Sequence, residues 1–428
     1  MLKKKLVCIL AVLAMAFTFC TGALAVGPAA ASESYVVMEA DSGQVLLSSN
    51  MHVAKNPASI TKIMTMGLAC EKSQGDWSTQ LTVSHDAVYS LAGTGSSHIA
   101  LLEDETVTLE QMLYAAELVS ANDASNVLAE YIGGSDIQSG VDAMNAKAAA
   151  LGLQNTHFTN PHGITGKQHY VSAYDMAEIL RWALQQPGFE ELFRADGTYT
   201  MPPTNKQPEE RYFSQKDYIR LPGKAYAYVP TVVGSKTGYT DEARYTYACL
   251  AEKDGVRLIC VVMHSQLRTD KFDDVEKLLN YAFSNFHRVT VPAGKVTAQV
   301  EVRGGGDGLG KLSLSTPELS LLAASDAIAQ SVQVAIHAPE SYILGQPYTA
   351  EAVYTVDGQG VQDSATIRIP LQVTGLQALL DRNHGLVLPT SGDVEAGGSS
   401  LPWLLGAGGF VAAALWYAFG KKPAKRKK

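Results

Sequence analysis

"RYTYACLAEKDGVRLICVVMHS", residues 244–265, indicates the fold more directly than any other stretch of the chain. Two runs rich in apolar and aromatic residues flank Asp254-Gly255, a dipeptide typical of the tight turn in a two-residue β-hairpin. The segment therefore predicts two antiparallel strands. A two-residue loop would place Cys249 directly opposite Cys260, either as two buried thiols, which we favour, or as a cross-strand disulfide.

A similar hairpin occurs near the start of the chain, at residues 34–50 ("SYVVMEADSGQVLLSSN"), where two strands surround an Asp41-Ser42-Gly43 turn. Strands at both ends of a region with helices between them predict an α/β sandwich whose terminal strands pair. We expect this domain to cover residues 34–290. Helical periodicity is found at residues 57–71, 108–132, 140–151, 173–186 and 273–286.

From about Pro292 the sequence changes to short alternating segments, which predict a small all-β sandwich domain over residues 291–386. The predicted strands are 295–302, 331–338, 348–356 and 365–373. Within this domain, "GGGDGLGKL" (304–312) nearly spells a phosphate-binding loop. Leu312 replaces the required Ser or Thr, so we interpret the segment as a connection between strands.

Both ends of the chain carry targeting signals. Residues 1–25 combine three lysines, an apolar run and an A-L-A cleavage site, as a signal peptide does. A linker (387–400) leads to the apolar residues 401–419, long enough to span a bilayer, and the basic residues 420–428 form a cytoplasmic tail. We expect an exported protein at the outer face of the cytoplasmic membrane, anchored at its C-terminus.

"LVLPTSGD" (386–393) lies before the apolar span in the order typical of a sortase sorting signal. Attachment to the cell wall through L-P-T-S-G is therefore the alternative to an uncut membrane anchor. Without the three signal lysines and the six cations of the tail, 25 basic residues face 42 acidic ones, a net charge of −17. Nucleic acid is not an expected partner of so acidic a body.

The stretch "NPASITKIMT" (56–65) places Lys62 three residues after Ser59, on one face of a predicted helix. Asn56 could cap that helix, and Pro57 suits its first turn. Apolar neighbours would bury the lysine and lower its pKa, so that its neutral amine could take the proton of the Ser59 hydroxyl. The alternative is a solvated lysine on an amphipathic helix, since a lone S-x-x-K is common by chance.

"ELVSANDASN" (117–126) places Ser120 and Asn122 at a break within helical sequence. A hydroxyl and an amide there could relay a proton and hold a substrate carbonyl. The alternative is a helix cap, because caps use the same residue types.

"VVGSKTGYTDEARY" (232–245) brings Lys236, Thr237 and Gly238 into a predicted strand. A cation and a hydroxyl suit a substrate carboxylate, and the glycine lets a substrate backbone approach the strand closely. The alternative for Lys236 is a charge that protects an edge strand from aggregation.

Together and in this order, the three motifs resemble those of the penicillin-binding proteins and serine β-lactamases. The chain is most similar to the low-molecular-weight D-alanyl-D-alanine carboxypeptidases of the peptidase S11 type. Four segments carry that resemblance: "SANDASN" (120–126), "NTHFTNPHGI" (155–164), "HYVSAYDMA" (169–177) and "SKTGYTDEA" (235–243). The resemblance implies an α/β (α+β) domain of the penicillin-binding, β-lactamase-like transpeptidase class, followed by the all-β domain and a C-terminal transmembrane helix.

The resemblance also implies roles for individual residues. Ser59 would be the nucleophile and Lys62 its general base. Ser120 and Asn122 would form the second wall of the site. The residues that would bind the substrate are Lys236 and Thr237, which hold its terminal carboxylate, and Gly238 with Tyr239, whose backbone N–H would complete an oxyanion hole with that of Ser59.

The implied function is a serine D,D-carboxypeptidase that removes the terminal D-alanine from peptidoglycan stem peptides through an acyl-enzyme on Ser59. β-Lactams would be covalent inhibitors. No cofactor is expected, and His157, His162 and His169 lack the spacing of metal ligands.

Two alternatives remain from the residues. A β-lactamase or D,D-transpeptidase would use the same machinery, although no deacylation glutamate is evident. The E-x-x-L-N-like "EKLLN" (276–280) follows the K-T-G motif instead of preceding it. The other alternative, a catalytically silent cell-wall surface protein on this scaffold, would not explain why all three motifs are present.

Overall fold

The structure is a computed structural model that describes residues 27–371, except residue 216 and the segments 224–227, 305–306, 325–331, 344–349 and 357–364. The described chain forms two compact units that divide between His287 and Arg288. The predicted signal peptide, linker, L-P-T-S-G motif, apolar span and basic tail lie outside the described residues. Within that described range, no helix combines the length and apolar character needed to cross a membrane.

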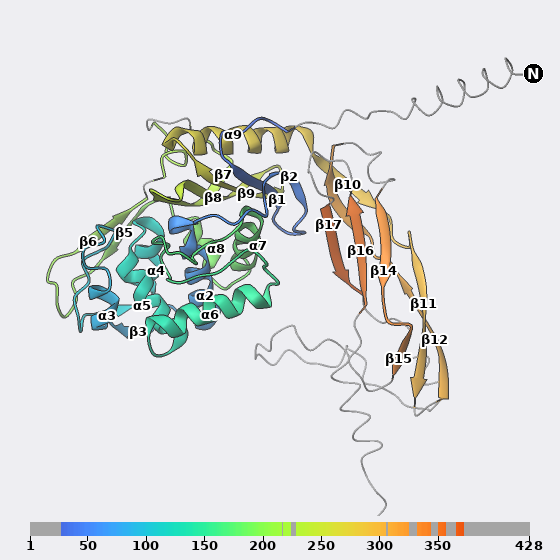
Figure 1. Ribbon diagram of the computed structural model, residues 1–428, viewed down its shortest axis with the longest axis horizontal. Coiled ribbons are helices and arrows are strands. Elements are labelled where there is room, and N and C mark those ends of the chain that lie inside the picture. Colours follow the sequence, from blue (N-terminus) through green and yellow to red (C-terminus); the bar gives the residue numbers. More distant parts are fainter. Residues whose placement is uncertain are drawn as a thin grey trace, which may run out of the picture. The chain divides into compact units, whose positions relative to one another are not determined.

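A five-stranded antiparallel sheet forms the centre of the first unit, in the order β2-β1-β9-β8-β7 (Figure 1). Strand β1 lies between β2 and β9, and Ser34 is opposite Met263. The terminal strands of the unit therefore pair, as the two hairpin segments predict. The strands are β1 (Ser34–Glu39), β2 (Val45–Ser49), β7 (Val232–Thr240), β8 (Arg244–Lys253) and β9 (Val256–Ser265).

The β8–β9 hairpin turns on Asp254 and Gly255, whose φ angles are +50° and +77°. Positive φ at both central residues is what a type I′ turn requires, and its twist matches that of the two strands. Cys249 is opposite Cys260, as a two-residue loop predicts. Both cysteines are buried free thiols, which confirms the favoured alternative.

Helices cover both faces of this sheet. Helix α9 (Arg268–Asn285) packs on one face, and α7 (Ala173–Ala183) with the 3₁₀ turn η1 (Ala58–Thr61) packs on the other (Figure 1). The remaining helices are α2 (Lys62–Ser73), α3 (His85–Tyr89), α4 (Leu109–Leu118), α5 (Asn122–Gly133), α6 (Ile137–Ala150) and α8 (Phe189–Phe193). Two small sheets pair β3 (Gln80–Thr82) with β4 (Thr106–Thr108) and β5 (Thr198–Met201) with β6 (Arg211–Ser214).

The periodic segment 108–132 forms two helices, α4 and α5, because the chain breaks between them at the predicted place. Thr108 begins α4 with a capping box that involves Gln111. Ser120, between the helices, has a φ of +58°, in the left-handed region that most residues avoid. The break therefore presents Ser120 and Asn122 at a helix junction.

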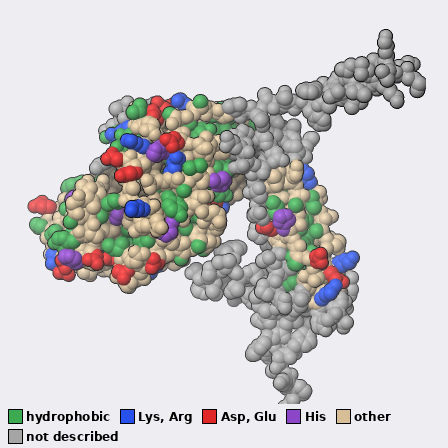
Figure 2. Space-filling view, viewed as in Figure 1, with side chains coloured by type: hydrophobic (Ala, Val, Ile, Leu, Met, Phe, Trp, Pro, Cys, Tyr) green, Lys and Arg blue, Asp and Glu red, His purple; other side chains and the backbone are tan. Residues whose placement is uncertain are grey.

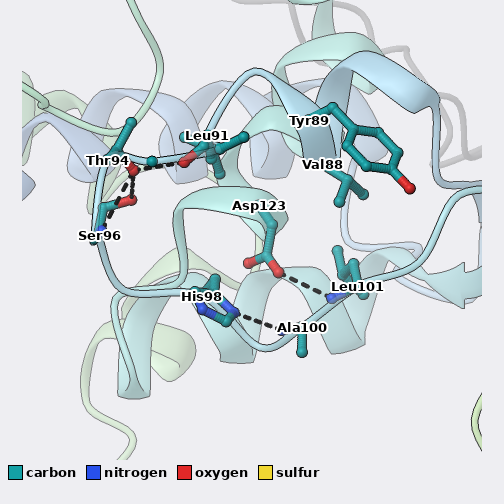
Figure 3. A pocket seen from close by; sticks show the side chains of 12 residues that line it. Val88, Tyr89, Leu91, Thr94, Ser96, His98, Ala100, Leu101 and Asp123 are labelled. Carbon is teal, nitrogen blue, oxygen red and sulfur yellow. Dashed lines mark hydrogen bonds between the residues drawn. The ribbon is translucent and has the colours of Figure 1, made fainter.

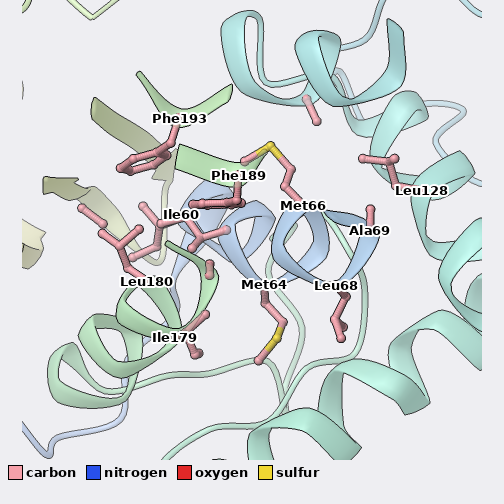
Figure 4. Packing of buried hydrophobic residues seen from close by; sticks show 14 of the residues in the cluster. Ile60, Met64, Met66, Leu68, Ala69, Leu128, Ile179, Leu180, Phe189 and Phe193 are labelled. Carbon is pink, nitrogen blue, oxygen red and sulfur yellow. The ribbon is translucent and has the colours of Figure 1, made fainter. Parts of the chain in front are cut away.

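Helix α2 is the central helix of the unit, and every residue from Lys62 to Cys70 is buried. Its apolar side chains pack against α5, α7 and α8; Figure 4 shows Ala69 toward Leu128 of α5, Met64 toward Ile179 of α7 and Met66 toward Phe189 of α8. Each fully buried side chain of this kind stabilises the fold by about 1.5–3 kcal/mol. The side chain of Lys62, at the start of this helix, is fully buried.

The chain before β1 is fastened to α9 by one buried carboxylate. Asp274 accepts hydrogen bonds from the backbone N–H groups of Ala31 (3.0 Å) and Ser32 (2.7 Å) and from the Ser32 hydroxyl (2.6 Å). The Ser32 hydroxyl also lies 2.8 Å from that of Ser265, at the end of β9. Specific contacts of the first unit therefore begin before residue 34.

The described residues of the second unit form strands and no helices. They make three small sheets, β10–β13, β12–β11–β15 and β14–β16–β17. Of the glycine-rich segment, Gly304 ends β11 and residues 307–312 lie in β12, where Leu312 is opposite Val300. The strands are β10 (His287–Val291), β11 (Thr297–Gly304), β12 (Asp307–Ser315), β13 (Leu319–Ala323), β14 (Gln333–His337), β15 (Ser341–Ile343), β16 (Glu351–Val356) and β17 (Ala365–Pro370).

Candidate active site

Ser59 lies in the 3₁₀ turn η1, one turn before α2 begins at Lys62. The expectation that Asn56 caps this helix is wrong, because Pro57 occupies the cap position and no side chain caps the turn. A tertiary contact holds the turn instead, since the Thr246 hydroxyl of β8 donates to the Pro57 carbonyl oxygen at 2.8 Å. The sheet thus positions the serine.

Two glycines let neighbouring backbone approach this turn closely. A Cβ on Gly163, which has a φ of +94°, would lie 1.9 Å from the carbonyl oxygen of Ala58. A Cβ on Gly238 of β7 would lie 2.8 Å from the backbone nitrogen of Ser59. Neither position can accept a side chain without moving η1. The turn that carries Ser59 is therefore held between the loop of Gly163 and strand β7.

Lys62 is fully buried, and its amine nitrogen contacts three groups. Nζ donates to Asn122 Oδ1 at 2.7 Å and to the His162 carbonyl oxygen at 2.8 Å, and it lies 3.2 Å from Ser59 Oγ. Burial lowers the pKa of Lys62 well below its ordinary value, and the charge of Lys236 lowers it further. The surroundings therefore favour the neutral amine.

A neutral amine has two N–H groups and one lone pair. Asn122 Oδ1 and the His162 carbonyl oxygen can only accept, so they use both N–H groups of Lys62. The lone pair is then left for the third neighbour, the Ser59 hydroxyl, which has a proton to donate. This arrangement is what a general base for a serine nucleophile requires.

The loop of residues 155–171 supplies one of these acceptors. The Asn160 side chain shapes the loop by accepting from the N–H of Gly163 at 2.7 Å and donating to the Ile164 carbonyl oxygen at 2.7 Å. His169 Nδ1 accepts from the Thr159 N–H at 3.0 Å, so its Nε2–H donates to the Thr61 hydroxyl at 2.9 Å. Burial lowers the pKa of His169 to about 4, so this histidine is neutral.

Asn122 begins α5, and its backbone N–H donates to the Ser97 carbonyl oxygen at 2.8 Å. Because Oδ1 accepts from Lys62, the Nδ2 group remains as the donor for a substrate carbonyl. Ser120 has a buried hydroxyl oxygen with no hydrogen-bond partner among the described residues. A buried hydroxyl without a partner is costly unless something else, such as a substrate, completes it.

Strand β7 carries the K-T-G motif, and the Lys236 side chain is only 3% exposed. Burial lowers the pKa of Lys236, while the carboxyls of Glu117 and Asp217 oppose that change. Tyr239, two residues past Thr237, is 48% exposed, and its ring lies 4.5 Å from that of Tyr245. The strand thus presents a buried cation, then a hydroxyl, then an exposed ring.

A pocket of about 330 Å³ is lined by residues of the segment 88–101 and by Asp123 (Figure 3). Asp123 holds this segment in place, because its carboxylate accepts hydrogen bonds from the backbone N–H groups of Ile99 and Leu101 at 3.1 Å each.

Acidic and basic side chains are interspersed on the face of the first unit that Figure 2 shows.

Of the residues that the sequence singled out, Ser59, Lys62 and Asn122 are in direct hydrogen-bond contact, and Gly238 lies against Ser59. Lys236 acts on the pKa of Lys62. The structure adds three groups that sequence reasoning missed: the His162 carbonyl, the close approach of Gly163, and the buried carboxyl of Glu117. Only the segment "NTHFTNPHGI" contained a signal for the first two, and nothing in it specified their role.

The fold is that of the penicillin-binding, transpeptidase-like proteins. Among solved structures, the chain resembles the DD-transpeptidase of Streptomyces K15, with a TM-score of 0.55 and 25% identity over 60% of this chain and 99% of that one. It also resembles a D-alanyl-D-alanine carboxypeptidase from Mycobacterium tuberculosis, with a TM-score of 0.53 and 28% identity over 60% and 92% of the two chains.

The model of the D-alanyl-D-alanine carboxypeptidase family, peptidase S11, matches residues 22–266. The D-alanyl-D-alanine carboxypeptidase DacF of Bacillus subtilis is 36% identical over 296 residues, which cover 67% of this chain and 71% of that protein. DacB2 of Mycobacterium tuberculosis is 31% identical over 60% of this chain and 83% of its own. The chain belongs to the peptidase S11 family and is a serine D-Ala-D-Ala carboxypeptidase.

Proposed function

We propose that Ser59 is the nucleophile and Lys62 the general base of this carboxypeptidase. Ser59 Oγ attacks the carbonyl carbon of the bond between the last two D-alanines of a stem peptide, and its proton passes to Lys62 Nζ. The C–N bond then breaks, and the proton reaches the nitrogen of the departing D-alanine, with the Ser120 hydroxyl as the relay. The product is an ester between Ser59 and the shortened peptide.

Water completes the cycle. It attacks the ester carbonyl and gives its proton to Lys62, after which Ser59 Oγ leaves and recovers a proton. In both halves of the reaction, the backbone N–H groups of Ser59 and Tyr239 stabilise the oxyanion. β-Lactams enter the first half in the same way and remain on Ser59 as stable esters.

The observation that carries these roles is the set of contacts around Lys62. Its two N–H groups are used by acceptors that cannot donate, and its remaining neighbour is the Ser59 hydroxyl at 3.2 Å. A lysine with a purely structural role would not need a serine hydroxyl beside its amine.

Residues of strand β7 and the side chain of Asn122 would bind the substrate. Lys236 and Thr237 would hold the terminal carboxylate of the peptide, and the Asn122 Nδ2 group would donate to the carbonyl of the preceding residue. Tyr239 would contact the substrate at the rim. Lys236 and Thr237 make a free C-terminus the feature that the enzyme recognises.

We infer that the enzyme works at the outer face of the cytoplasmic membrane. Residues 1–25 direct export, residues 291–386 form a small all-β domain that acts as a stalk, and residues 401–419 anchor the chain in the cytoplasmic membrane. Sortase attachment through L-P-T-S-G is the alternative anchor. In either case the active site faces the peptidoglycan.

Labelling with a fluorescent penicillin, combined with D-alanine release, tests the two central roles. Ser59→Ala should abolish both signals, because the covalent nucleophile is gone. Lys62→Ala should slow acylation by about 10²–10⁴-fold, the range for loss of a general base, while circular dichroism stays unchanged. Near-normal labelling of a folded Lys62→Ala protein would refute the role given to the lysine.

A further inference from the structure

Helix α5 begins without a side-chain cap. Its cap position holds Ala121, whose methyl group cannot accept a hydrogen bond, and no side chain caps the helix. Asn122, the first helical residue, uses its side chain elsewhere, because Oδ1 accepts from Lys62 at 2.7 Å. The residue whose amide is proposed to bind the substrate therefore lies at a helix end that must be held in another way.

A neighbouring loop holds this helix end at two consecutive residues. The Asn122 N–H donates to the Ser97 carbonyl oxygen at 2.8 Å. The carboxylate of Asp123 accepts hydrogen bonds from the backbone N–H groups of Ile99 and Leu101, both at 3.1 Å. Figure 3 shows this carboxylate directed at Leu101. The start of α5 is thus fastened to the loop by its backbone and by one side chain.

The loop receives the carboxylate in a concave turn of its backbone. Between the two donors, Ala100 has a φ of +57°, in the left-handed region that few residues other than glycine adopt. Its own N–H donates to His98 Nδ1 at 3.0 Å. Backbone N–H groups around a left-handed residue can converge into a nest that binds an anion. Here the anion is the Asp123 carboxylate, whose residue is only 3% exposed.

The loop is itself fixed from its other side by the β5–β6 hairpin. Gln207 Nε2 donates to the Ala100 carbonyl oxygen at 2.7 Å, and Arg211 Nη1 donates to the Ile99 carbonyl oxygen at 3.3 Å. Arg211 also pairs with the fully buried carboxyl of Glu105. The nest therefore has supports of its own, and it gives the helix end a fixed point of attachment.

The ordinary explanation of Asp123 is that an acidic residue in the first turn of a helix interacts favourably with the helix dipole. That explanation accounts for the hydrogen bond from the Ala124 N–H, at 2.9 Å. It does not account for the two donors from the loop. Burial raises the pKa of Asp123, and the hydrogen bonds from Leu101, Ile99 and Ala124 oppose that rise. The loop thus supplies donors that a buried carboxylate needs.

We propose that Asp123 is a positioning residue, which orients the side-chain amide of Asn122 by docking its own carboxylate in the nest of residues 99–101. This inference rests on the substrate-binding role of Asn122 in the proposed function. Asp123 touches neither the substrate nor the reacting atoms, and it acts only through its neighbour. With the helix end held at both residues, Asn122 Oδ1 stays on Lys62 and Nδ2 stays directed at the substrate.

Two β-lactams test this orientation in the full-length protein. Benzylpenicillin has an acylamino carbonyl to which Asn122 Nδ2 would donate. Aminopenicillanic acid has the same ring system and carboxylate but an amine in place of the acylamino group. The ratio of their acylation rate constants therefore reports the Asn122 amide, because any effect through Ser59, Lys62 or Lys236 applies to both compounds. Asn122→Ala should lower this ratio by about 5–10-fold, as expected for one hydrogen bond.

Asp123→Asn replaces one acceptor oxygen by an NH₂ group that cannot accept from the nest. The ratio should fall by about 3–10-fold, toward that of Asn122→Ala, because the amide is no longer held in place. Asp274→Asn is the matched control, since Asp274 is also a buried carboxylate that accepts backbone N–H groups, those of Ala31 and Ser32. It should lower the melting temperature and keep the wild-type ratio.

Ala100 provides a second pair of variants, which leave the buried carboxylate unchanged. Its side chain is exposed, so substitutions there should not prevent folding. Ala100→Val disfavours the left-handed conformation and should lower the ratio, because a β-branched residue rarely adopts a positive φ. Ala100→Gly accepts that conformation and should keep the ratio. If Asp123→Asn does not fold, this pair decides the question, and equal ratios in the two variants refute the inference.

The remaining outcomes separate this inference from the proposed function. A folded Asp123→Asn protein that acylates more slowly with both compounds at the wild-type ratio would show a purely structural role and overturn the inference. A wild-type ratio in Asn122→Ala would overturn the role of Asn122 in the proposed function, and the inference with it. A lowered ratio in Asn122→Ala, Asp123→Asn and Ala100→Val, but not in Asp274→Asn, supports both.

Discussion

Lys62 and Lys236 have similar burial but different partners. Acceptors that carry no charge surround the Lys62 amine, namely an amide oxygen and a main-chain carbonyl. Carboxyls oppose the fall in the pKa of both lysines, one for Lys62 (Asp123) and two for Lys236 (Glu117 and Asp217). The pKa of Lys62 is nevertheless held well below its ordinary value, so the two positions suit the neutral and the charged form. The residue type alone would not distinguish the two roles.

The role of Lys236 predicts a change in substrate preference. Lys236→Ala should lose about 10–100-fold in kcat/KM on peptides ending in D-Ala-D-Ala, as expected for one hydrogen bond to a charged group. It should also lose the preference for a free over an amidated C-terminus. Lys253→Ala, a substitution of an exposed lysine at the end of β8, serves as the control. If the preference ratio is the same in Lys236→Ala and wild type, Lys236 does not bind the carboxylate.

At the scale of elements, the site is the junction of η1, the loop 155–171 and strand β7. Each contributes backbone as well as side chains, and the elements meet at glycines because a side chain would separate them. Local geometry around Ser59 therefore depends on chain segments that are distant in the sequence.

Gly163 provides a test of that dependence. Gly163→Ala adds a left-handed alanine, which costs about 1–2 kcal/mol, and also forces a Cβ to within 1.9 Å of the Ala58 carbonyl oxygen. We expect a larger loss of unfolding free energy than the φ angle explains, and a drop in acylation rate of about 10²-fold from misplacement of Ser59. Denaturant unfolding and penicillin labelling measure the two effects.

Gly152 is the matched control, because it has a φ of +73° but open space where a Cβ would go. Gly152→Ala should show only the backbone cost and should acylate normally. Equal effects of the two substitutions would show that the contact with Ala58 is unimportant.

The sequence predicted elements better than it predicted their contacts. The hairpins at residues 34–50 and 244–265 were evident because turn residues and apolar strands occur together. Strands β10, β12, β13 and β15 were missed, since their alternation is weaker or interrupted by glycine. Asn56 was mistaken for a cap because the contact that replaces the cap comes from Thr246. The Glu117 carboxyl is buried without a hydrogen-bond partner among the described residues. That burial results from tertiary packing, which no local sequence pattern predicts.

At the scale of the molecule, every proposed catalytic group lies in the first unit. We expect a fragment of residues 27–287 to fold and to be acylated by penicillin at a rate close to that of the full-length protein. Labelling kinetics and a melting curve measure this directly. A folded 27–287 fragment that is not acylated would mean that the second unit completes the site.

The starting residue of the fragment matters as well. A fragment of residues 34–287 lacks Ala31 and Ser32, so the buried carboxylate of Asp274 would lose the hydrogen bonds that it accepts from them. Leaving a buried charge without partners costs about 3–5 kcal/mol. This shorter fragment should therefore melt at a lower temperature than the 27–287 fragment.

The place of β1 between β2 and β9 has a consequence for the newly made chain. Ser34 pairs with Met263, so one edge of β1 has no partner until β9 has been synthesised. At about 5–20 residues per second, that delay is roughly 10–50 s. Meanwhile the apolar strand "SYVVME" presents unpaired N–H and C=O groups, which is the feature that leads to aggregation. We therefore expect this protein to depend on a holding chaperone during biogenesis, until the chain up to residue 265 is available to pair with β1.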